Sequence, residues 1–545
     1  VSADLAAAGA VRSSVLVALA WAITVFRTGS EANRSVKPVR VTRQIYSGLP
    51  TVLKHCTRQP LHRSAPPARH SSSAHSDAPL LLPDPCPTVV VVSTPATLVI
   101  LGASGDLTHR LLLPGLGTLL KLHSRPDLTL VGAAMEEMTD DAWRELVGKA
   151  LVEGGCPPSR MEQLLASTRY VKIDVTNPDE LKALLASLPS DPVLYFALPP
   201  AITMKACDAL TKIELPANLR LALEKPFGRD AATAHELNQL LATLVPEKQI
   251  FRVDHFLGKS TVLNLLGLRF ANRIFEPVWN ASNIERVDII TDETLALEGR
   301  AGYYDHSGAM KDMIQSHLLL VMALFAMEEP ARIDHVELRD LMVHVLRATQ
   351  LFTGDPMTST RRARYVAGVI AGKPIPNYTD EPGVDAANNT ETLAEMTLRI
   401  NTSRWAGVPF RLRSGKALGD GRNAITITFK PVGHLPEGFV NTPAQNIISI
   451  GMKPENIAVG ISTNAEGDSL DLEDSVLFTE LGSSAIRPYG EILQGILDGD
   501  PLLSVRGDIA EECWRILGPV LEAWGDGRVP MDEYRAGSSG PNTWK

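Results

Sequence analysis

The chain has 545 residues, of which 44% are hydrophobic and 21% charged, as in a soluble globular protein with more than one domain. Its formal net charge of -9 gives no electrostatic reason to expect a nucleic acid or an anionic membrane as partner, so a local cluster of cations would have to hold any anionic ligand. Five scattered cysteines without a CxxC pair argue against a disulfide framework or a zinc site. We therefore expect no metal and a reducing, cytoplasmic compartment.

Residues 1–95 differ in composition from the rest of the chain. They are basic, and "RSAPPARHSSSAHSDAPLLLPDPCP" is typical of Pro- and Ser-rich disorder. The apolar run "SSVLVALAWAITVF" is short for a membrane span, and the acid-poor composition also resembles an organellar transit peptide. We expect a disordered or extraneous leader here, and a targeting leader stays open as the alternative.

From residue 96 onward, short apolar runs alternate with amphipathic segments. The runs "TLVILG", "LTLVGA", "RYVKID", "VLYFAL", "LRLALE" and "QIFRV" predict strands, and segments such as "DDAWRELVGKALVE" predict helices. Near-continuous apolar strands between helices indicate a parallel sheet covered on both faces. We expect a doubly wound, Rossmann-like dinucleotide-binding domain over residues 96–254. The longer, more alternating strands over residues 255–545 favour an α+β domain with a mainly antiparallel sheet.

Two motifs of the first domain point to ligands. "GASGDLTHR" (residues 102–110) follows the first strand, and a Gly-rich turn before a helix presents N–H groups to a pyrophosphate. The plain alternative is a structural turn between strand and helix. Lys225 in "LALEKPFG" ends another strand, where ligands bind in open α/β sheets, although a single Lys there is more often a solvated loop residue.

The stretch "FRVDHFLGK" (residues 251–259) places Asp254, His255 and Lys259 after a predicted strand. Further along, Asp312 and His317 interrupt the apolar sequence of a predicted helix, and their spacing of five would not put them on one stripe of an α-helix. A lone His in such a helix is more often a hydrogen-bonded core residue. An imidazole oriented by a carboxylate is a competent general base, and Asp254 is a candidate for that carboxylate.

Several stretches together resemble one family. "GASGDL", "ALPP", "EKPFGRD", "RVDHFLGK", "LRFANRIFEPVWN", "LEGRAGYYD", "RWAGVPFRLRSGKAL" and "YRAGSSGP", in this order, resemble the glucose-6-phosphate dehydrogenase family over about residues 96–540. The resemblance implies a homodimer or homotetramer that oxidises glucose 6-phosphate to 6-phosphogluconolactone with NADP, or with NAD, in the oxidative pentose phosphate pathway.

The resemblance also implies roles for individual residues. His317 would be the catalytic base and Asp254 its carboxylate partner. The implied substrate-binding residues are Lys225, His255, Lys259, Glu293, Asp312, Lys416 and Arg422. The implied cofactor-binding residues are Gly102, Ser104, Gly105, Asp106, Leu107, Met135, Pro199 and Lys225.

This sequence departs from the family pattern at three places. Leu111 stands where the family usually has Lys, Phe256 where it usually has Tyr, and Met135, before Glu136 and Glu137, where an Arg commonly takes the 2'-phosphate of NADP. The alternatives are therefore a divergent NAD-dependent dehydrogenase of another sugar phosphate, or a non-catalytic sugar-phosphate-binding relative. Asp254 and His317 favour the enzyme, because a binding protein would not require the pair.

Overall fold

The computed structural model describes residues 37–40, 96–189, 191–299, 301–467, 470–482 and 484–544. Of the leader expected over residues 1–95, these include β1 (Lys37–Arg40), which pairs in parallel with β18 (Leu472–Glu480). The expectations for the rest of the leader lie outside the described residues.

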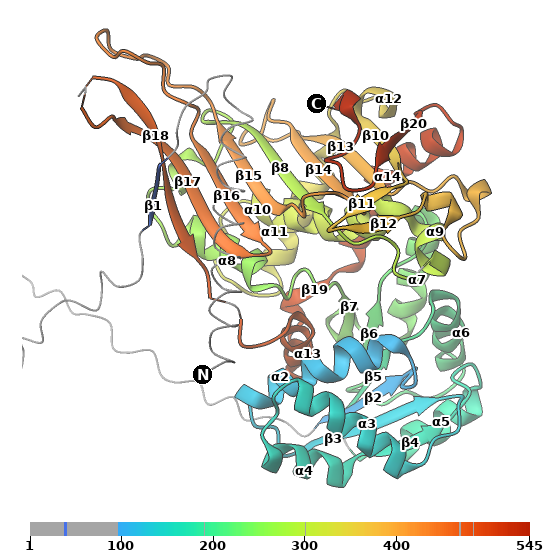
Figure 1. Ribbon diagram of the computed structural model, residues 1–545. Helices are drawn as coiled ribbons and strands as arrows, with labels where there is room; N and C mark the ends of the chain where they lie inside the picture. The colour runs from blue at the N-terminus through green and yellow to red at the C-terminus, as the bar shows by residue number, and fades with distance from the viewer. Residues whose placement is uncertain are drawn as a thin grey trace, which may run out of the picture. The chain divides into compact units, whose positions relative to one another are not determined.

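The first sheet has seven strands in the order β19-β7-β6-β5-β2-β3-β4 (Figure 1). Its parallel strands are β2 (Ala96–Leu101), β3 (Leu128–Ala134), β4 (Arg169–Lys172), β5 (Pro192–Phe196), β6 (Arg220–Glu224) and β7 (Ile250–Val253). The helices between them are α2 (Leu113–Leu122), α3 (Asp140–Glu153), α4 (Pro158–Ser167), α5 (Pro178–Ala186), α6 (Pro200–Leu210) and α7 (Ala231–Leu244). The strand order turns at β2, between β3 and β5, as in a doubly wound fold.

Both faces of this sheet are covered because its strands are apolar throughout. Val99 and Leu101 of β2 belong to the core that includes residues of α5, α6 and α7, whereas Leu98 and Ile100 belong to the core that includes residues of α2, α3 and α4. Successive side chains of a strand point to opposite faces, so one continuous apolar run serves both cores. The predicted doubly wound architecture is confirmed.

The second sheet is larger and mainly antiparallel, as predicted. Its main path runs β1-β18-β17-β16-β15-β8-β14-β13-β10-β20, with β9 beside β13 (Figure 1). The strands are β8 (Ile284–Asp292), β9 (Thr349–Leu351), β10 (Thr360–Val366), β13 (Leu393–Ile400), β14 (Phe410–Gly415), β15 (Asn423–Phe429), β16 (Ile447–Met452), β17 (Glu455–Asn464) and β20 (Met531–Arg535), with a separate hairpin of β11 (Gly368–Ile370) and β12 (Lys373–Ile375). The further helices are α8 (Ser260–Phe270), α11 (Glu337–Ala348), α12 (Pro356–Ser359), α13 (Pro488–Asp498) and α14 (Gly507–Gly525).

A long helical segment supports the second sheet. It consists of α9 (Ala301–Ala309), the π-helix η5 (Met310–Leu318) and α10 (Leu319–Ala326). By length and composition it could cross a membrane, but its most apolar window is 83% buried inside the protein. The apolar sequence is therefore explained by packing in the core, where η5 lies against β13 and β14.

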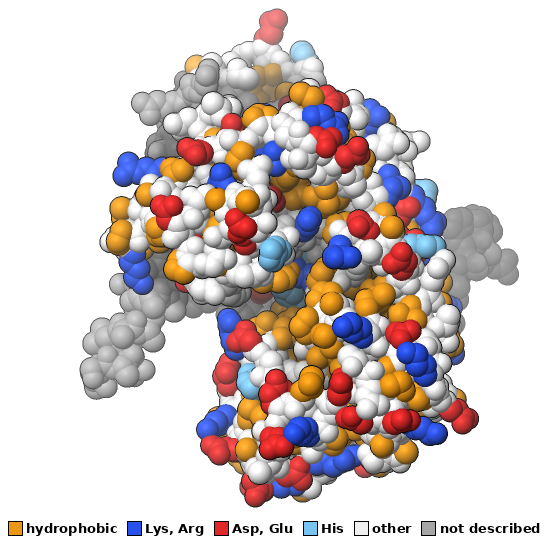
Figure 2. All heavy atoms as spheres, turned by 90° about the vertical axis from the view of Figure 1, so that its right-hand side faces the viewer, with side chains coloured by type: hydrophobic (Ala, Val, Ile, Leu, Met, Phe, Trp, Pro, Cys, Tyr) orange, Lys and Arg blue, Asp and Glu red, His pale blue; other side chains and the backbone are white. Residues whose placement is uncertain are grey.

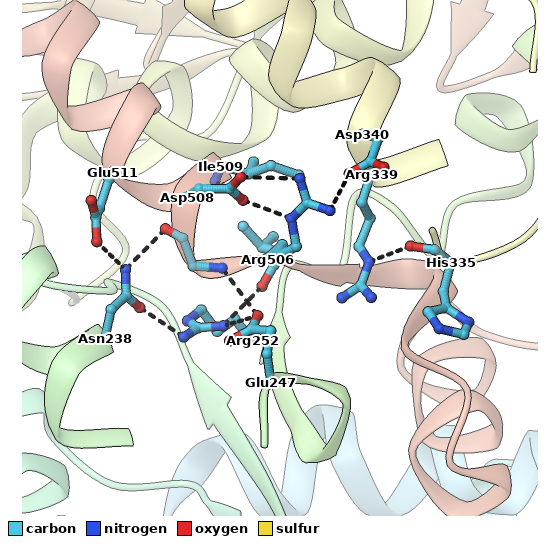
Figure 3. A network of polar contacts seen from close by, with 12 residues as sticks. Asn238, Glu247, Arg252, His335, Arg339, Asp340, Arg506, Asp508, Ile509 and Glu511 are labelled. Carbon is cyan, nitrogen blue, oxygen red and sulfur yellow. Dashed lines mark hydrogen bonds and ion pairs between the residues drawn. The ribbon is translucent and has the colours of Figure 1, made fainter. Parts of the chain in front are cut away.

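The C-terminal part of the chain returns to the first sheet. β19 (Ser504–Val505) pairs antiparallel with β7, and buried residues of α13 join the core on the α2 side. Arg252 of β7 is 1% exposed and donates to Glu247 Oε1 and Asn238 Oδ1, both at 2.7 Å (Figure 3). Asn238 in turn donates to Gly507 O at the start of α14, so this network fixes the strand that directly precedes Asp254.

The surface carries charges of both signs. On the face shown in Figure 2, acidic and basic side chains are interspersed, and hydrophobic side chains gather across the middle.

Candidate active site

His317 and Asp254 form a buried hydrogen-bonded pair. Asp254 follows β7 directly, at the carboxyl end of a parallel strand, and His317 lies in η5. The distance from His317 Nδ1 to Asp254 Oδ1 is 2.6 Å, and the side chains are 2% and 0% exposed. The Phe256 N–H donates to the same oxygen at 2.9 Å and helps to hold the carboxylate. The two residues that the sequence predicts as a pair thus lie in contact.

The π-helix corrects one expectation. The spacing of five between Asp312 and His317 was expected to separate them around an α-helix, but residues 310–318 form a π-helix. In a π-helix the hydrogen bonds run from i to i+5, so residues five apart lie one turn above each other. The expected separation is wrong because the local period is longer. The charge of Lys225 acts on both side chains and lowers the pKa of each.

Burial sets the protonation states of the pair. Burial lowers the pKa of His317 below its ordinary value and outweighs the opposing effect of Asp254. Burial would raise the pKa of Asp254, but the charge interaction and the hydrogen bond with His317 lower it overall. At neutral pH the pair is therefore a neutral imidazole and a carboxylate. Because Nδ1 donates to Asp254, the lone pair of Nε2 is available to accept a proton.

Two ion pairs join four of the predicted substrate-binding residues. Lys225 Nζ lies 2.6 Å from Asp312 O and 3.0 Å from Asp312 Oδ1. Burial would lower the pKa of Lys225, but Asp312 raises it overall, so the amine stays charged. Lys416 Nζ lies 2.5 Å from Glu293 Oε2, and its charge also lowers the pKa of Asp312. Both pairs thus belong to one cluster of predicted substrate residues.

His255 and Lys259 also lie beside the pair. The His255 ring is edge-on to His317, with 4.7 Å between centroids. Lys259 Nζ lies 3.1 Å from the centroid of the Phe256 ring, which stacks on His317 at 4.2 Å. Burial lowers the pKa of Lys259 to about 8, and the charge of Lys453 acts in the same direction. Lys259 is half-buried and Lys453 is exposed, and two ammonium groups that repel each other favour an anionic ligand.

Arg422 has different neighbours. Burial lowers its pKa, and the charged groups around it are Asp292, Arg413, Arg411 and Asp420. None of these belongs to the predicted substrate set. Its role in substrate binding stays a prediction.

Sequence reasoning missed a second buried network beside the pair. The Tyr195 hydroxyl donates to Glu224 Oε1 at 2.5 Å, and burial raises the pKa of Glu224 to about 7. Tyr489 also hydrogen-bonds Glu224, and its ring stacks on His255 with 5.7 Å between centroids. The position of Glu224 next to Lys225 at a strand end was a usable signal. Tyr489 gave none, because it comes from the distant α13.

The Gly-rich turn lies at the point where the strand order of the first sheet reverses. Gly102 follows β2 and Ala197 follows β5, its neighbour in the sheet. Gly102 has a φ of +89°, and an added Cβ would lie 2.3 Å from Ala197 O, so only glycine fits this turn. A dinucleotide binds in this crevice of a doubly wound sheet. The residues present therefore fit such a cofactor.

The other predicted cofactor residues surround this turn. Ser104, Gly105 and Leu107 are half-buried, and Asp106 is exposed. Pro199 caps the start of α6 after β5, and Met135 after β3 is 65% exposed. The helix that follows the turn includes a π-helical section, η2 (Thr108–Leu112), and Leu111 is 43% exposed.

Asp254 and His317, together with His255, also lie close enough to one another to be considered as metal ligands. Ligand atoms of Asp254, His255 and His317 lie within 4.8 Å of one another. A cation would have to compete with the His317–Asp254 hydrogen bond for these atoms, whereas acid–base chemistry uses that bond as it stands.

Comparisons with known proteins agree with this geometry. Residues 99–264 match the family model "glucose-6-phosphate dehydrogenase, NAD binding domain", and residues 266–545 match the corresponding C-terminal domain. The chain is 39% identical over 467 residues to a glucose-6-phosphate 1-dehydrogenase of Gluconobacter oxydans (strain 621H), covering 82% of this chain and 94% of that protein. It is 36% identical over 479 residues to the one of Treponema pallidum (strain Nichols), covering 82% and 92%.

Solved structures lead to the same family. A glucose-6-phosphate dehydrogenase in complex with its substrate glucose-6-phosphate is similar with a TM-score of 0.74 and 29% identity, covering 83% of this chain and 96% of that chain. A glucose-6-phosphate 1-dehydrogenase from Mycobacterium avium is similar with a TM-score of 0.72 and 32% identity, covering 82% and 95%. The chain belongs to the glucose-6-phosphate dehydrogenase family.

Proposed function

We propose that this chain oxidises C1 of glucose 6-phosphate with His317 as the base and Asp254 as its orienting partner. The observation that carries the proposal is their buried contact of 2.6 Å, with the remaining nitrogen of the imidazole available. The product is 6-phosphogluconolactone, because loss of hydride and of the hydroxyl proton at C1 turns the hemiacetal into a lactone.

The residues divide the work of the reaction. The bound dinucleotide supplies the hydride acceptor. His317 Nε2 takes the proton of the C1 hydroxyl, and the carboxylate of Asp254 stabilises the imidazolium that forms. Burial of both side chains strengthens this electrostatic stabilisation, since little water screens it.

The remaining polar groups select the substrate. Lys225, Asp312, Glu293 and Lys416 would hold the sugar hydroxyls, and His255 and Lys259 the 6-phosphate. Their support is the position of the Lys225–Asp312 pair and of His255 next to His317, together with the Lys416–Glu293 pair. Arg422 would contribute nearby on the substrate side. By family resemblance we also expect a homodimer or homotetramer working in the cytoplasm.

The experiment compares substrates that differ in the phosphate or in the sugar. Reduced nicotinamide is followed by absorbance for the purified chain with glucose 6-phosphate, free glucose and other sugar phosphates, each with NAD and with NADP. We expect kcat/KM for glucose 6-phosphate to exceed that for glucose by at least about 10²-fold, which corresponds to two charge-assisted contacts of about 1.5 kcal/mol each.

A matched pair of variants tests the phosphate site. Lys259→Gln should lower kcat/KM for glucose 6-phosphate by about tenfold or more and leave that for glucose nearly unchanged. Lys248→Gln, which changes an exposed Lys of the dinucleotide-binding domain, should change neither. A higher kcat/KM for another sugar phosphate would support the divergent-dehydrogenase alternative. Absence of turnover with every combination of sugar substrate and cofactor would support the alternative of a non-catalytic sugar-phosphate-binding relative.

A further inference from the structure

We infer that Glu136 accepts a hydrogen bond from the ribose 2'-hydroxyl of the cofactor and that this chain binds NAD more tightly than NADP. The inference rests on the proposed function and deepens it, because it names which dinucleotide the site prefers. The cofactor-binding residues implied by the resemblance include Met135 and not Glu136, which the sequence marks, with Glu137, only as a departure from the family pattern.

The backbone brings Glu136 to the phosphate-binding turn. β2 and β3 pair in parallel, with Leu101 opposite Ala133. The N–H groups of Gly102 and Ala103 both donate to Ala133 O, at 2.8 Å and 3.2 Å. The residues just after β3 therefore lie beside the Gly-rich turn. In dinucleotide-binding folds an acidic residue in this region hydrogen-bonds the ribose 2'-hydroxyl of NAD.

The side chain of Glu136 is held at this turn. The Ser104 hydroxyl donates to Glu136 Oε2 at 2.8 Å, and the Tyr170 hydroxyl donates to the carbonyl oxygen of Glu136 at 2.8 Å. The hydrogen bond from Ser104 lowers the pKa of the Glu136 carboxyl, which is therefore ionised at neutral pH. A carboxylate accepts a bond from a hydroxyl but repels a phosphate dianion.

The basic side chains near the turn are already engaged within the described part of the chain. Arg110 Nη1 lies 3.1 Å from Asp106 Oδ2. Lys172 Nζ lies 2.5 Å from Glu137 Oε1. His109 Nε2 lies 3.0 Å from Ala103 O. A 2'-phosphate would have to draw one of them away from its partner while facing Glu136.

Lys172 is one competitor to this inference, and Arg110 is another, because its pair with Asp106 is also exposed, at 59% and 74%. The ion pair of Lys172 with Glu137 is well exposed, at 58% and 82%, and exposed pairs contribute little stability. Lys172 could therefore turn to a phosphate at small cost. A variant of Lys172 shows whether this residue binds the 2'-phosphate of NADP or stays paired with Glu137.

The test measures binding directly, without sugar phosphate. Dissociation constants of NAD and NADP are determined by titration calorimetry on the full chain and on Glu136→Gln, Lys172→Gln and Glu145→Gln. Glu145 is a matched control, because it is an exposed carboxylate of α3 that pairs with Lys149. We expect the unmodified chain to bind NAD at least about tenfold more tightly than NADP, and Glu136→Gln to reduce this ratio about tenfold by weakening NAD and strengthening NADP.

The other two variants should leave the ratio within about threefold. Tighter binding of NADP by the unmodified chain, or an unchanged ratio in Glu136→Gln, overturns the inference. A loss of NADP binding confined to Lys172→Gln assigns the phosphate to Lys172 and overturns it as well. Absence of binding for both dinucleotides contradicts the proposed function itself, so the two failures are distinguishable.

Discussion

Replacing His317 with Asn tests the proposed base most directly. The Asn amide can still donate to Asp254 Oδ1 across a buried contact that is 2.6 Å in the unmodified protein, but it offers no nitrogen lone pair to take a proton. Loss of a general base costs about 10²- to 10⁴-fold in turnover, or roughly 3 to 5 kcal/mol of barrier. We expect kcat to fall by this factor and the dissociation constant of glucose 6-phosphate to change less than about threefold.

The pH profile adds a second readout. Because burial lowers the pKa of His317 below its ordinary value, the base is already neutral at pH 7, and its protonation should lower kcat/KM on the acid side. The His317→Asn variant should lack this acid limb, since its residual rate does not depend on an imidazole. Asp254→Asn should keep part of the limb and lose less activity than His317→Asn, because Asp254 orients the base without taking the proton.

The effect of each substitution on protein stability must be separated from its effect on turnover. Removing one member of a buried pair can destabilise a protein by about 3 to 5 kcal/mol, so the thermal midpoint of each variant is measured beside its kinetics. His344→Asn is a control, since His344 is an exposed residue of α11. A folded His317→Asn variant that keeps more than about one tenth of the turnover would refute the assignment of the base.

Three further changes have defined outcomes. Glu391 accepts a hydrogen bond from the Met310 N–H at 2.9 Å, and burial raises its pKa to about 7. The protonated carboxyl therefore stabilises the protein at acidic pH, and the free energy of unfolding should fall by up to about 3 kcal/mol as pH rises from about 5 through 7. In urea titrations, Glu391→Gln should lack this dependence of the unfolding free energy on pH. With the pKa of Lys259 at about 8, kcat/KM for glucose 6-phosphate should fall above pH 8, and a similar fall in Lys259→Arg would argue against it. Gly102→Ala should weaken dinucleotide binding at least about tenfold in calorimetry, whereas Gly267→Ala, whose Cβ meets nothing within 4 Å, should not.

Much of the nucleotide-binding sheet could be predicted because each of its strands carries local information. β2 and β3 are buried almost throughout, so their apolar runs differ clearly from the amphipathic helices around them. β19 has two residues and belongs to the same sheet only because β7 pairs with it from far along the chain. A segment so short has no periodicity of its own, and its position depends on tertiary contacts.

The site shows the same division between local and long-range information. Asp254, His255 and Lys259 could be predicted together because one strand end carries them. Their relation to His317 depends on η5, whose π-helical period no apolar pattern indicates, because the positions 310–318 are mostly buried on several sides. Glu224 and Tyr489 were missed for a related reason, since their network joins β6 to the remote α13.

The arrangement of the polar groups explains how the site can be buried and still accept a sugar. Within the described residues, Lys225 Nζ donates to Asp312 O and Oδ1, and an ammonium has three N–H groups. Its third N–H is available to a hydroxyl without breaking the ion pair. The same reasoning applies to His317, which uses one nitrogen for Asp254 and offers the other. Unpaired buried charges would cost several kcal/mol each, so partial pairing keeps the protein folded and leaves one bonding position per group for the substrate.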